Sequence, residues 1–204
     1  MNLISVLIPF YNREDYLLEA LQSITNQTNK DWQAILYDDG STDRSTEIAE
    51  DWLTQNPGFL IRSEMNRGVG HARDYLLGLV DTPYACWMDS DDFSMPERLD
   101  KQIGMIKNFD IVFSSLRFCK DGRCGAKYTI DVSKYTSREG LYNNTTFATG
   151  FFRSDLATYP FMDLQRKEDV LWLVSLIEDG IKFGYIDEDL YHVRQHDKRL
   201  TIKE

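Results

Sequence analysis

The chain has 204 residues, 42% of them hydrophobic and 27% charged, which is typical of one globular domain with a sizeable core and excludes a disordered chain. Its 33 acidic side chains outnumber 23 basic ones, for a net charge of −10. This balance argues against nucleic acid as a partner, because phosphate contacts require clustered Lys and Arg. An acidic protein can still bind an anionic ligand if a cation bridges the two.

No targeting or membrane segment is expected. The first residues lack the basic region of a signal peptide, and no apolar run reaches the roughly 18 residues of a membrane span. The three cysteines, Cys86, Cys119 and Cys124, have neither the number of a disulfide framework nor the paired spacing of a zinc site. We therefore expect reduced thiols and a cytoplasmic protein.

Strands and helices alternate through the first half of the chain. Residues 3–10, LISVLIPF, form a continuous β-rich run, typical of a strand buried on both faces of a parallel sheet. Further strands are expected at 32–39, 58–63 and 84–89, and helices at 14–27, 41–53, 68–80 and 95–106. Ser41 or Thr42 is expected to cap the second helix, and Pro96 to lie in the first turn of the fourth. This alternation predicts βαβ units and a mostly parallel sheet flanked by helices.

The second half has a different pattern. Residues 110–130 predict a hairpin with Asp121-Gly122 as its turn, so that Cys119 and Cys124 face each other across two strands. Residues 131–150 are polar and predict a loop. A helix is expected at 168–180, ending at Gly180, and short strands at 182–187 and 189–193. We predict one α/β domain, residues 1–204, with a smaller mixed or antiparallel C-terminal part.

Carboxylates gather where the expected strands end. Ligands of an open α/β sheet bind beyond the carboxyl ends of its parallel strands. The first strand ends in Pro9-Phe10-Tyr11-Asn12, and five aspartates follow the second and fourth strands: Asp38, Asp39, Asp89, Asp91 and Asp92. Carboxylate oxygens suit Mg²⁺ or Mn²⁺, whose remaining ligands are often substrate phosphates. The pattern predicts a divalent cation that holds a phosphorylated ligand.

Simpler interpretations stay open for parts of this acidic rim. Asp38 or Asp39 also fits as a helix cap, and residues 89–92 fit as a turn. They do not form an EF-hand, because Phe93, Ser94 and Asp100 stand where that loop needs Asp or Asn, Gly and Glu. Likewise GVGHAR, residues 68–73, is a weak match to a dinucleotide-binding motif, because it opens the third helix and not the first.

Several motifs, in order, resemble those of the family 2 glycosyltransferases, which have the GT-A fold. They are VLIPFYNREDYLLEALQSITNQT (6–28), YDDGSTDRS (37–45), NRGVGHARD (66–74), WMDSDDFSMPERL (87–99), KEDVLW (167–172) and YHVRQHDKRLT (191–201). The resemblance covers nearly the whole chain. It implies transfer of a sugar from a nucleotide-diphosphate sugar, most often a UDP-sugar, with inversion at the anomeric carbon. Residues 1–110 would then bind the donor, and residues 111–204 would supply the acceptor site and the catalytic base.

The resemblance also implies roles for residues that bind the nucleotide. Pro9 and Tyr11 would line the base pocket, and Asp39 would accept a hydrogen bond from the base. Arg73 would contact the base or the diphosphate. For Tyr11, ordinary packing in the core is the alternative.

Asp89-Ser90-Asp91 match the D-x-D motif of this family. Asp89 would serve the ribose or the metal, Ser90 the donor, and Asp91 the metal, Mn²⁺ or Mg²⁺. His196 matches a histidine that many relatives place near the metal and diphosphate, although a surface histidine needs no function. The remaining histidines are expected to be structural: His71 and His192.

Glu168 and Asp169 open the helix expected at 168–180, where the helix N-terminus favours a carboxylate. One of them therefore also fits as a cap. The resemblance implies that Asp169 is the general base that removes the proton from the acceptor hydroxyl, with Glu168 as the alternative. One-step displacement needs no protein nucleophile, and the chain has no evident Ser-His-Asp or Cys-His pairing.

The alternative functions are a phosphatase, a nucleotidyltransferase and a binding module without turnover. A phosphatase of the haloacid dehalogenase type carries its D-x-D motif on the first strand, whereas here it lies near residue 90. A nucleotidyltransferase normally has a basic, Gly-rich loop after that strand, and PFYNRED is not one. A nucleotide-sugar-binding module without turnover also remains open.

The acceptor is expected to be a carbohydrate, a lipid-linked molecule or a protein, bound by the second half of the chain. Tyr142, Phe147 and Phe151 fit as rings that stack on it, and equally as core residues. The chain ends without the C-terminal helices with which many relatives meet membranes, which favours a soluble enzyme.

Overall fold

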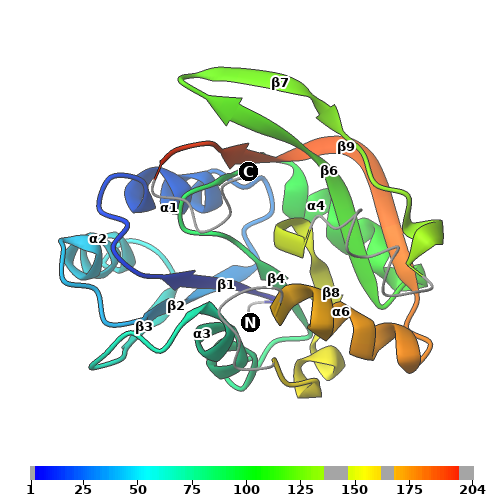
Figure 1. The fold of residues 1–204 in the computed structure, drawn as a ribbon, viewed down its shortest axis with the longest axis horizontal. Helices are drawn as coiled ribbons and strands as arrows, with labels where there is room; N and C mark the ends of the chain where they lie inside the picture. Colours follow the sequence, from blue (N-terminus) through cyan, green and yellow to red (C-terminus); the bar gives the residue numbers. More distant parts are fainter. Residues whose placement is uncertain (1–2, 136–146, 162–167, 198–204) are drawn as a thin grey trace.

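The computed structural model describes residues 3–135, 147–161 and 168–197 (Figure 1). The strands are β1 (Ile4–Phe10), β2 (Trp32–Asp38), β3 (Gly58–Arg62), β4 (Tyr84–Trp87), β5 (Phe93–Ser94), β6 (Ile111–Lys120), β7 (Arg123–Tyr128), β8 (Phe151–Arg153) and β9 (Phe183–Arg194). The helices are α1 (Leu17–Thr25), α2 (Ser45–Leu53), α3 (Val69–Leu77), α4 (Arg98–Met105) and α6 (Glu168–Glu178). Short 3₁₀ turns follow at Ile106–Asn108, Val132–Lys134, Phe147–Thr149 and Ser154–Thr158.

All these strands belong to one mixed sheet in the order β3-β2-β1-β4-β8-β6-β9-β5, with β7 paired to β6. The first four run parallel, which confirms the βαβ prediction. Phe10 lies opposite Asp38, and Leu7 lies opposite Trp87. The carboxyl ends of β1, β2 and β4 therefore meet at one edge, where the aspartates follow.

Two apolar clusters cover the two faces of the sheet. Alternate side chains of β1 (Ile4, Val6, Ile8) pack with residues of α1, α2 and α4. Leu7 points to the other face, into a cluster with α3 and α6. Figure 1 shows α1 and α2 on the side of the sheet opposite α3. The β-rich run of residues 3–10 is thus buried on both faces, as predicted.

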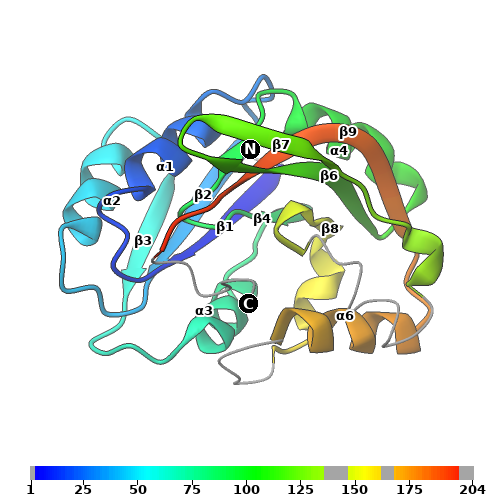
Figure 2. The same cartoon turned by 45° about the horizontal axis from the view of Figure 1, so that its top comes forward.

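The second half adds antiparallel strands. β8 joins β4 to β6 in antiparallel pairings, and β6 runs parallel to β9 (Figure 2). The hairpin is confirmed, since Asp121 and Gly122 have φ of 51° and 74°, as a two-residue primed turn requires. The prediction of two final strands is wrong. They form one strand, β9, whose pairing with β6 shifts so that Asp187 and Glu188 bulge out between Ile186 and Asp189.

Three helices begin later than expected. The second, α2, begins at Ser45 and not at Ser41, because the Ser41 N–H donates to Asp38 Oδ1 in the turn after β2. Helix α1 begins at Leu17, and α4 begins two residues after Pro96. Gly180 ends α6 as predicted, with φ of 74°, and the Ile181 N–H donates to Leu176 O.

The prediction of reduced thiols is wrong for two of the three cysteines. Cys119 and Cys124 occupy directly paired positions of β6 and β7 and form a disulfide. Cys86 is a free thiol in the core, where burial raises its pKa to about 11. Among the described residues, no helix is long and apolar enough to cross a membrane. Of the loop expected at 131–150, residues 136–146 lie outside the described part.

Gly58 supports a first prediction, because β3 can pair with β2 only if this position lacks a side chain. Its φ is 145°, and a Cβ there would lie 2.1 Å from the Ala34 carbonyl oxygen. Gly58→Ala should lower the free energy of unfolding by at least about 2 kcal/mol, measured by denaturant unfolding. Gly104→Ala is the control. Nothing lies within 4 Å of its Cβ position in α4, so stability should hold or rise by about 0.5–1 kcal/mol. Equal losses in both variants would refute the steric explanation.

Candidate functional site

The acidic segment after β4, residues 89–92, is held in place by β9. The Asp89 N–H donates to the Tyr191 hydroxyl at 3.0 Å, and the Arg194 N–H donates to Asp92 Oδ1 at 2.9 Å. Tyr191 is fully buried, and the Arg98 guanidinium of α4 lies 5.0 Å from its ring centre. Burial raises the pKa of the Tyr191 hydroxyl, as do Asp92 and Asp89 nearby, so it stays a neutral hydrogen-bonding group. The segment is therefore anchored at two positions of β9.

Asp89 lies in an ion cluster with Arg73 of α3 and Glu168 of α6. Arg73 Nη2 donates to Asp89 Oδ1 at 3.2 Å, and Arg73 Nη1 donates to Glu168 Oε1. The guanidinium also lies 4.7 Å from the centre of the Phe147 ring. One buried cation thus connects three segments that are far apart in sequence.

The charges in this cluster depend on one another. Burial alone would lower the pKa of the Arg73 guanidinium, but the carboxylates of Asp89 and Glu168 raise it overall. Burial raises the pKa of the Glu168 carboxyl, and the Arg73 charge opposes that rise. Removing either partner would leave a buried charge without compensation.

Asp91 forms a second cluster. Its Oδ2 accepts a hydrogen bond from His196 Nε2 at 3.0 Å and lies 3.3 Å from Arg13 Nε. The His196 ring stacks on Tyr16 with centres 4.1 Å apart, so its orientation is fixed. Asp91 is only 6% exposed.

The Asp91 cluster has the donors that a divalent cation requires. The Asp91 carboxylate comes from the segment after β4, and the His196 imidazole comes from the segment after β9. The two lie within hydrogen-bond distance of each other. Mn²⁺ accepts both donor types, and Mg²⁺ prefers the oxygen. His196 Nδ1 is buried and has no hydrogen-bond partner among the described residues, so Asp91 is the one hydrogen-bonding partner that the structure shows for this ring. These residues therefore fit a divalent ion, provided that the Arg13 guanidinium leaves the shared oxygen.

The other two aspartates have backbone partners. Asp38 is fully buried, where it accepts hydrogen bonds from the Ser41 N–H and the Thr46 hydroxyl. Asp39 accepts the N–H groups of Arg67 and Gly68, one on each oxygen, at 2.9 and 2.8 Å. Burial raises the pKa of Asp39, and these hydrogen bonds oppose the rise. Asp38 thus holds its own turn, and Asp39 fixes the start of α3.

Near these groups the surface is open. Tyr11 is 38% exposed just after β1, whereas Pro9 is half-buried and Ser90 is buried. A depression of about 430 Å³ lies at the ends of β2 and β3, lined by Gly40, Ser41, Thr42, Arg62, Ser63 and Glu64. It adjoins the segment after Tyr11, because the Asn12 N–H donates to Ser41 Oγ and the Thr42 N–H donates to Asn12 Oδ1.

At the start of α6, the two candidate bases differ. Glu168 is buried against Arg73, whereas Asp169 is half-buried and its Oδ1 accepts the Val170 N–H at 2.8 Å. Of the rings considered for the acceptor, Phe147 and Phe151 are buried in the core, and Tyr142 lies outside the described residues. The sequence reasoning missed Arg13. The sequence signal for Arg13 was its position as the only basic residue in the segment that follows the first strand, at the same edge as the aspartates.

Arg73 supports a second prediction. Arg73→Gln should lower the free energy of unfolding by about 3–5 kcal/mol at neutral pH, because it strands two carboxylates. Without the cation, the pKa of Glu168 rises further above the ordinary 4.5. The folded variant then binds a proton more readily than its unfolded chain, so it loses stability as pH rises through that window and regains it on acidification.

Denaturant unfolding at several pH values tests this, with Arg44→Gln as control. Arg44 pairs with Glu47 at the surface, so its loss should change stability by less than about 1 kcal/mol. A deficit of Arg73→Gln that does not shrink toward low pH would contradict the role given to Glu168.

Comparison with known proteins shows the family and the fold of this chain. The protein EpsE of Bacillus subtilis (strain 168), described as a putative glycosyltransferase, is 29% identical over 207 residues, covering 94% of this chain and 73% of EpsE. The structure of S. aureus TarS 1–349 in complex with UDP-GlcNAc superposes with a TM-score of 0.84 at 23% identity, covering 98% of this chain. The mannosyltransferase PcManGT from Pyrobaculum calidifontis, in complex with GDP-Man and Mn²⁺, gives a TM-score of 0.75 at 14% identity, covering 96% of this chain.

The chain spans 60% of that TarS chain and 57% of the PcManGT chain. These likenesses confirm the GT-A fold. The model of the family described as "Glycosyl transferase family 2" matches residues 5–161, most of the chain. The chain therefore belongs to glycosyl transferase family 2.

Proposed function

We propose that this chain transfers a sugar from a nucleotide-diphosphate sugar, a UDP-sugar, to an acceptor hydroxyl with inversion at the anomeric carbon. The observation that carries the proposal is a pair of carboxylates, the half-buried Asp89 and the buried Asp91, each held by a cationic side chain at the carboxyl edge of the parallel strands. The TarS complexes with UDP and UDP-GlcNAc, on the same fold, support a uridine donor.

The nucleoside would lie beyond the carboxyl ends of β1 and β2, which are paired neighbours in the sheet. Tyr11 presents an exposed ring beside Pro9, suited to stacking on a base. Asp39 uses one lone pair on each oxygen for backbone N–H groups, so further lone pairs remain for a base N–H. Arg73 and Ser90 flank Asp89 and would contact the ribose and diphosphate.

Asp91 and His196 would hold Mn²⁺ or Mg²⁺, and Asp89, which pairs with Arg73 in this structure, would join them when the ion binds. Such an ion, when bound, stabilises the negative charge of the departing diphosphate. The residues of this chain prepare the site. Tyr16 orients His196, and the Arg194 guanidinium donates to the Asp91 carbonyl oxygen at 3.0 Å. The Mn²⁺ in the PcManGT complex supports a divalent ion on this fold.

Asp169 would act as the general base. It is half-buried at the N-terminus of α6, where a carboxylate interacts favourably with the helix dipole. It would take the proton of the acceptor hydroxyl onto its carboxylate as that oxygen attacks the anomeric carbon. Glu168 is unsuited to the task, because Arg73 already occupies its carboxylate.

Nucleotide binding gives a third prediction. Thermal unfolding is measured with UDP, GDP, ADP, CDP and dTDP, each with and without Mn²⁺. UDP with Mn²⁺ should raise the melting temperature by several degrees, since ligand at 100 times its Kd adds about 2.7 kcal/mol. Asp91→Asn should lose this shift, and Asp51→Asn on the exposed face of α2 should keep it. If no nucleotide shifts the transition, the donor proposal fails.

For the general base, Asp169→Asn should leave UDP-dependent stabilisation intact and lower the rate of transfer or donor hydrolysis by about 10²–10⁴-fold. Asp179→Asn, at the other end of α6, should keep the activity. Normal turnover in Asp169→Asn would reassign the base to another group.

Tyr11→Ala should weaken UDP binding by about 1–3 kcal/mol, as measured by calorimetric titration, because a stacked base loses its aromatic partner. Tyr75 is similarly exposed on α3, and Tyr75→Ala should bind UDP as the wild type does. Unchanged affinity in Tyr11→Ala would mean that the ring does not touch the nucleotide.

A further inference from the structure

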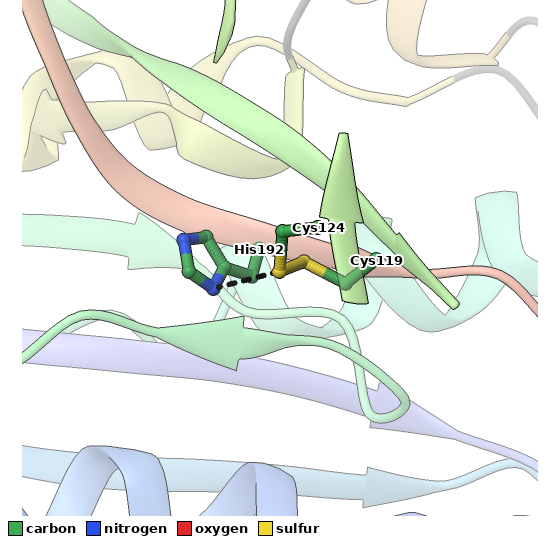
Figure 3. Close-up of side chains that lie close together, drawn as sticks. All are labelled: Cys119, Cys124 and His192. Carbon is green, nitrogen blue, oxygen red and sulfur yellow. Dashed lines mark hydrogen bonds between the residues drawn. A yellow bond between two sulfur atoms is a disulfide. The ribbon is translucent and has the colours of Figure 1, made fainter. Parts of the chain in front are cut away.

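A second group of side chains that can bind a metal lies on β6, β7 and β9. It consists of Cys119, Cys124 and His192. Their ligand atoms all lie within 4.8 Å of one another, and Cys124 Sγ is 3.9 Å from His192 Nδ1. Figure 3 shows the imidazole pointing its Nδ1 at the disulfide sulfur. None of these residues belongs to the clusters around Asp89 and Asp91.

The sheet fixes the backbones that carry the three side chains. Cys119 of β6 lies directly opposite Cys124 of β7, and Arg117, two residues earlier, lies opposite His192 of β9. The Gln195 N–H also donates to Cys119 O at 2.7 Å. The two cysteines and the histidine therefore meet on one face of three adjacent strands, and little ordering is needed to bring them together.

His192 is already oriented as a metal ligand would be. Its Nε2 lies 3.1 Å from Asp189 Oδ2, and Arg117 Nε donates to the same carboxylate. A histidine that donates one ring N–H to a carboxylate presents the other nitrogen as a lone pair, the arrangement common around zinc. Here the lone pair of Nδ1 faces the sulfurs.

The disulfide can open without loss of the hairpin. It closes a loop with a sequence separation of only 5, so it constrains the unfolded chain little. The same strands are joined by the turn at Asp121-Gly122 and by β6–β7 pairing on either side. Cys124 is exposed and Cys119 is buried beside it, so a reductant can reach the bond.

We propose that the reduced Cys119 and Cys124, together with His192, form a redox-gated site for Zn²⁺. A dithiol reductant gives two electrons and two protons to the S–S bond, which yields two thiols and leaves the reductant as a disulfide. Zn²⁺ then displaces both thiol protons to solvent and binds two thiolates and His192 Nδ1. Oxidation by a disulfide oxidant reverses the exchange and releases the ion.

The geometry suits zinc in particular. Zn–S bonds of about 2.3 Å and Zn–N bonds of about 2.0–2.1 Å place sulfur and nitrogen about 3.6 Å apart in a tetrahedron. The distance from Cys124 Sγ to His192 Nδ1 is 3.9 Å, close to this value, and reduction lets the two sulfurs separate. Thiolate ligands bind Zn²⁺ in preference to Mg²⁺ or Mn²⁺, the ions expected at the carboxylate of Asp91. Solvent next to the exposed Cys124 supplies the fourth ligand.

The test uses the full chain, reduced with a dithiol that is then removed without air, and titrated with Co²⁺ as a spectroscopic substitute for Zn²⁺. One equivalent should produce the sulfur-to-cobalt charge-transfer absorption, and Zn²⁺ should displace it. The disulfide form should produce none. Circular dichroism of the reduced, metal-free chain should match that of the oxidised chain.

Variants separate this site from the acidic one. Cys124→Ser and His192→Gln should lose the complex, and Asp189→Asn should bind about 10–100-fold more weakly. Cys86→Ala and Asp91→Asn should keep the charge-transfer band, because neither residue is a ligand here. Absence of the band in the reduced wild type, its persistence in Cys124→Ser, or unfolding on reduction would each overturn the proposal.

Discussion

Negative charge buried at one edge of the sheet is the constraint around which this protein is built. Asp38, Asp39, Asp91 and Asp92 are all nearly inaccessible to solvent. Removing a carboxylate from water costs several kcal/mol unless donors or cations replace the lost hydration. Each of these four therefore binds backbone N–H groups, a hydroxyl or a positive side chain, and the supply of these partners determines how the neighbouring segments are arranged.

The partners come from distant parts of the chain. Arg73 connects β4 to α6 through Asp89 and Glu168, and Asp91 connects the segments after β1 and β9 through Arg13 and His196. The expected donor half and the expected acceptor half therefore share one electrostatic interface. A cation and a nucleotide diphosphate would enter a region where the carboxylates are already oriented, so less ordering is needed on binding.

Much of the parallel part of the fold was predictable from sequence, because strands buried on both faces appear as continuous apolar runs. Apart from the hairpin of β6 and β7, the antiparallel part was not. Phe151–Arg153 and Phe93–Ser94 are strands too short to show a period, and the bulge in β9 depends on its pairing with β6. Asp89 and Asp91 stand out because only Ser90 separates them in the sequence. The ion cluster around Asp89 cannot be recognised in the sequence, because its members Arg73 and Glu168 are 95 positions apart and meet only in the fold. The facing cysteines follow from the turn, but their oxidation state depends on surroundings that no local pattern encodes.

Anomalous diffraction from crystals grown with UDP and Mn²⁺ shows whether the carboxylates of this edge hold a divalent ion and a nucleotide. We expect a manganese peak bonded to Asp91 and His196, the diphosphate on the same ion, and the Arg13 guanidinium withdrawn from Asp91 Oδ2. Bound UDP with the Arg13–Asp91–His196 contacts unchanged, and no manganese between Asp91 and His196, would contradict this expectation.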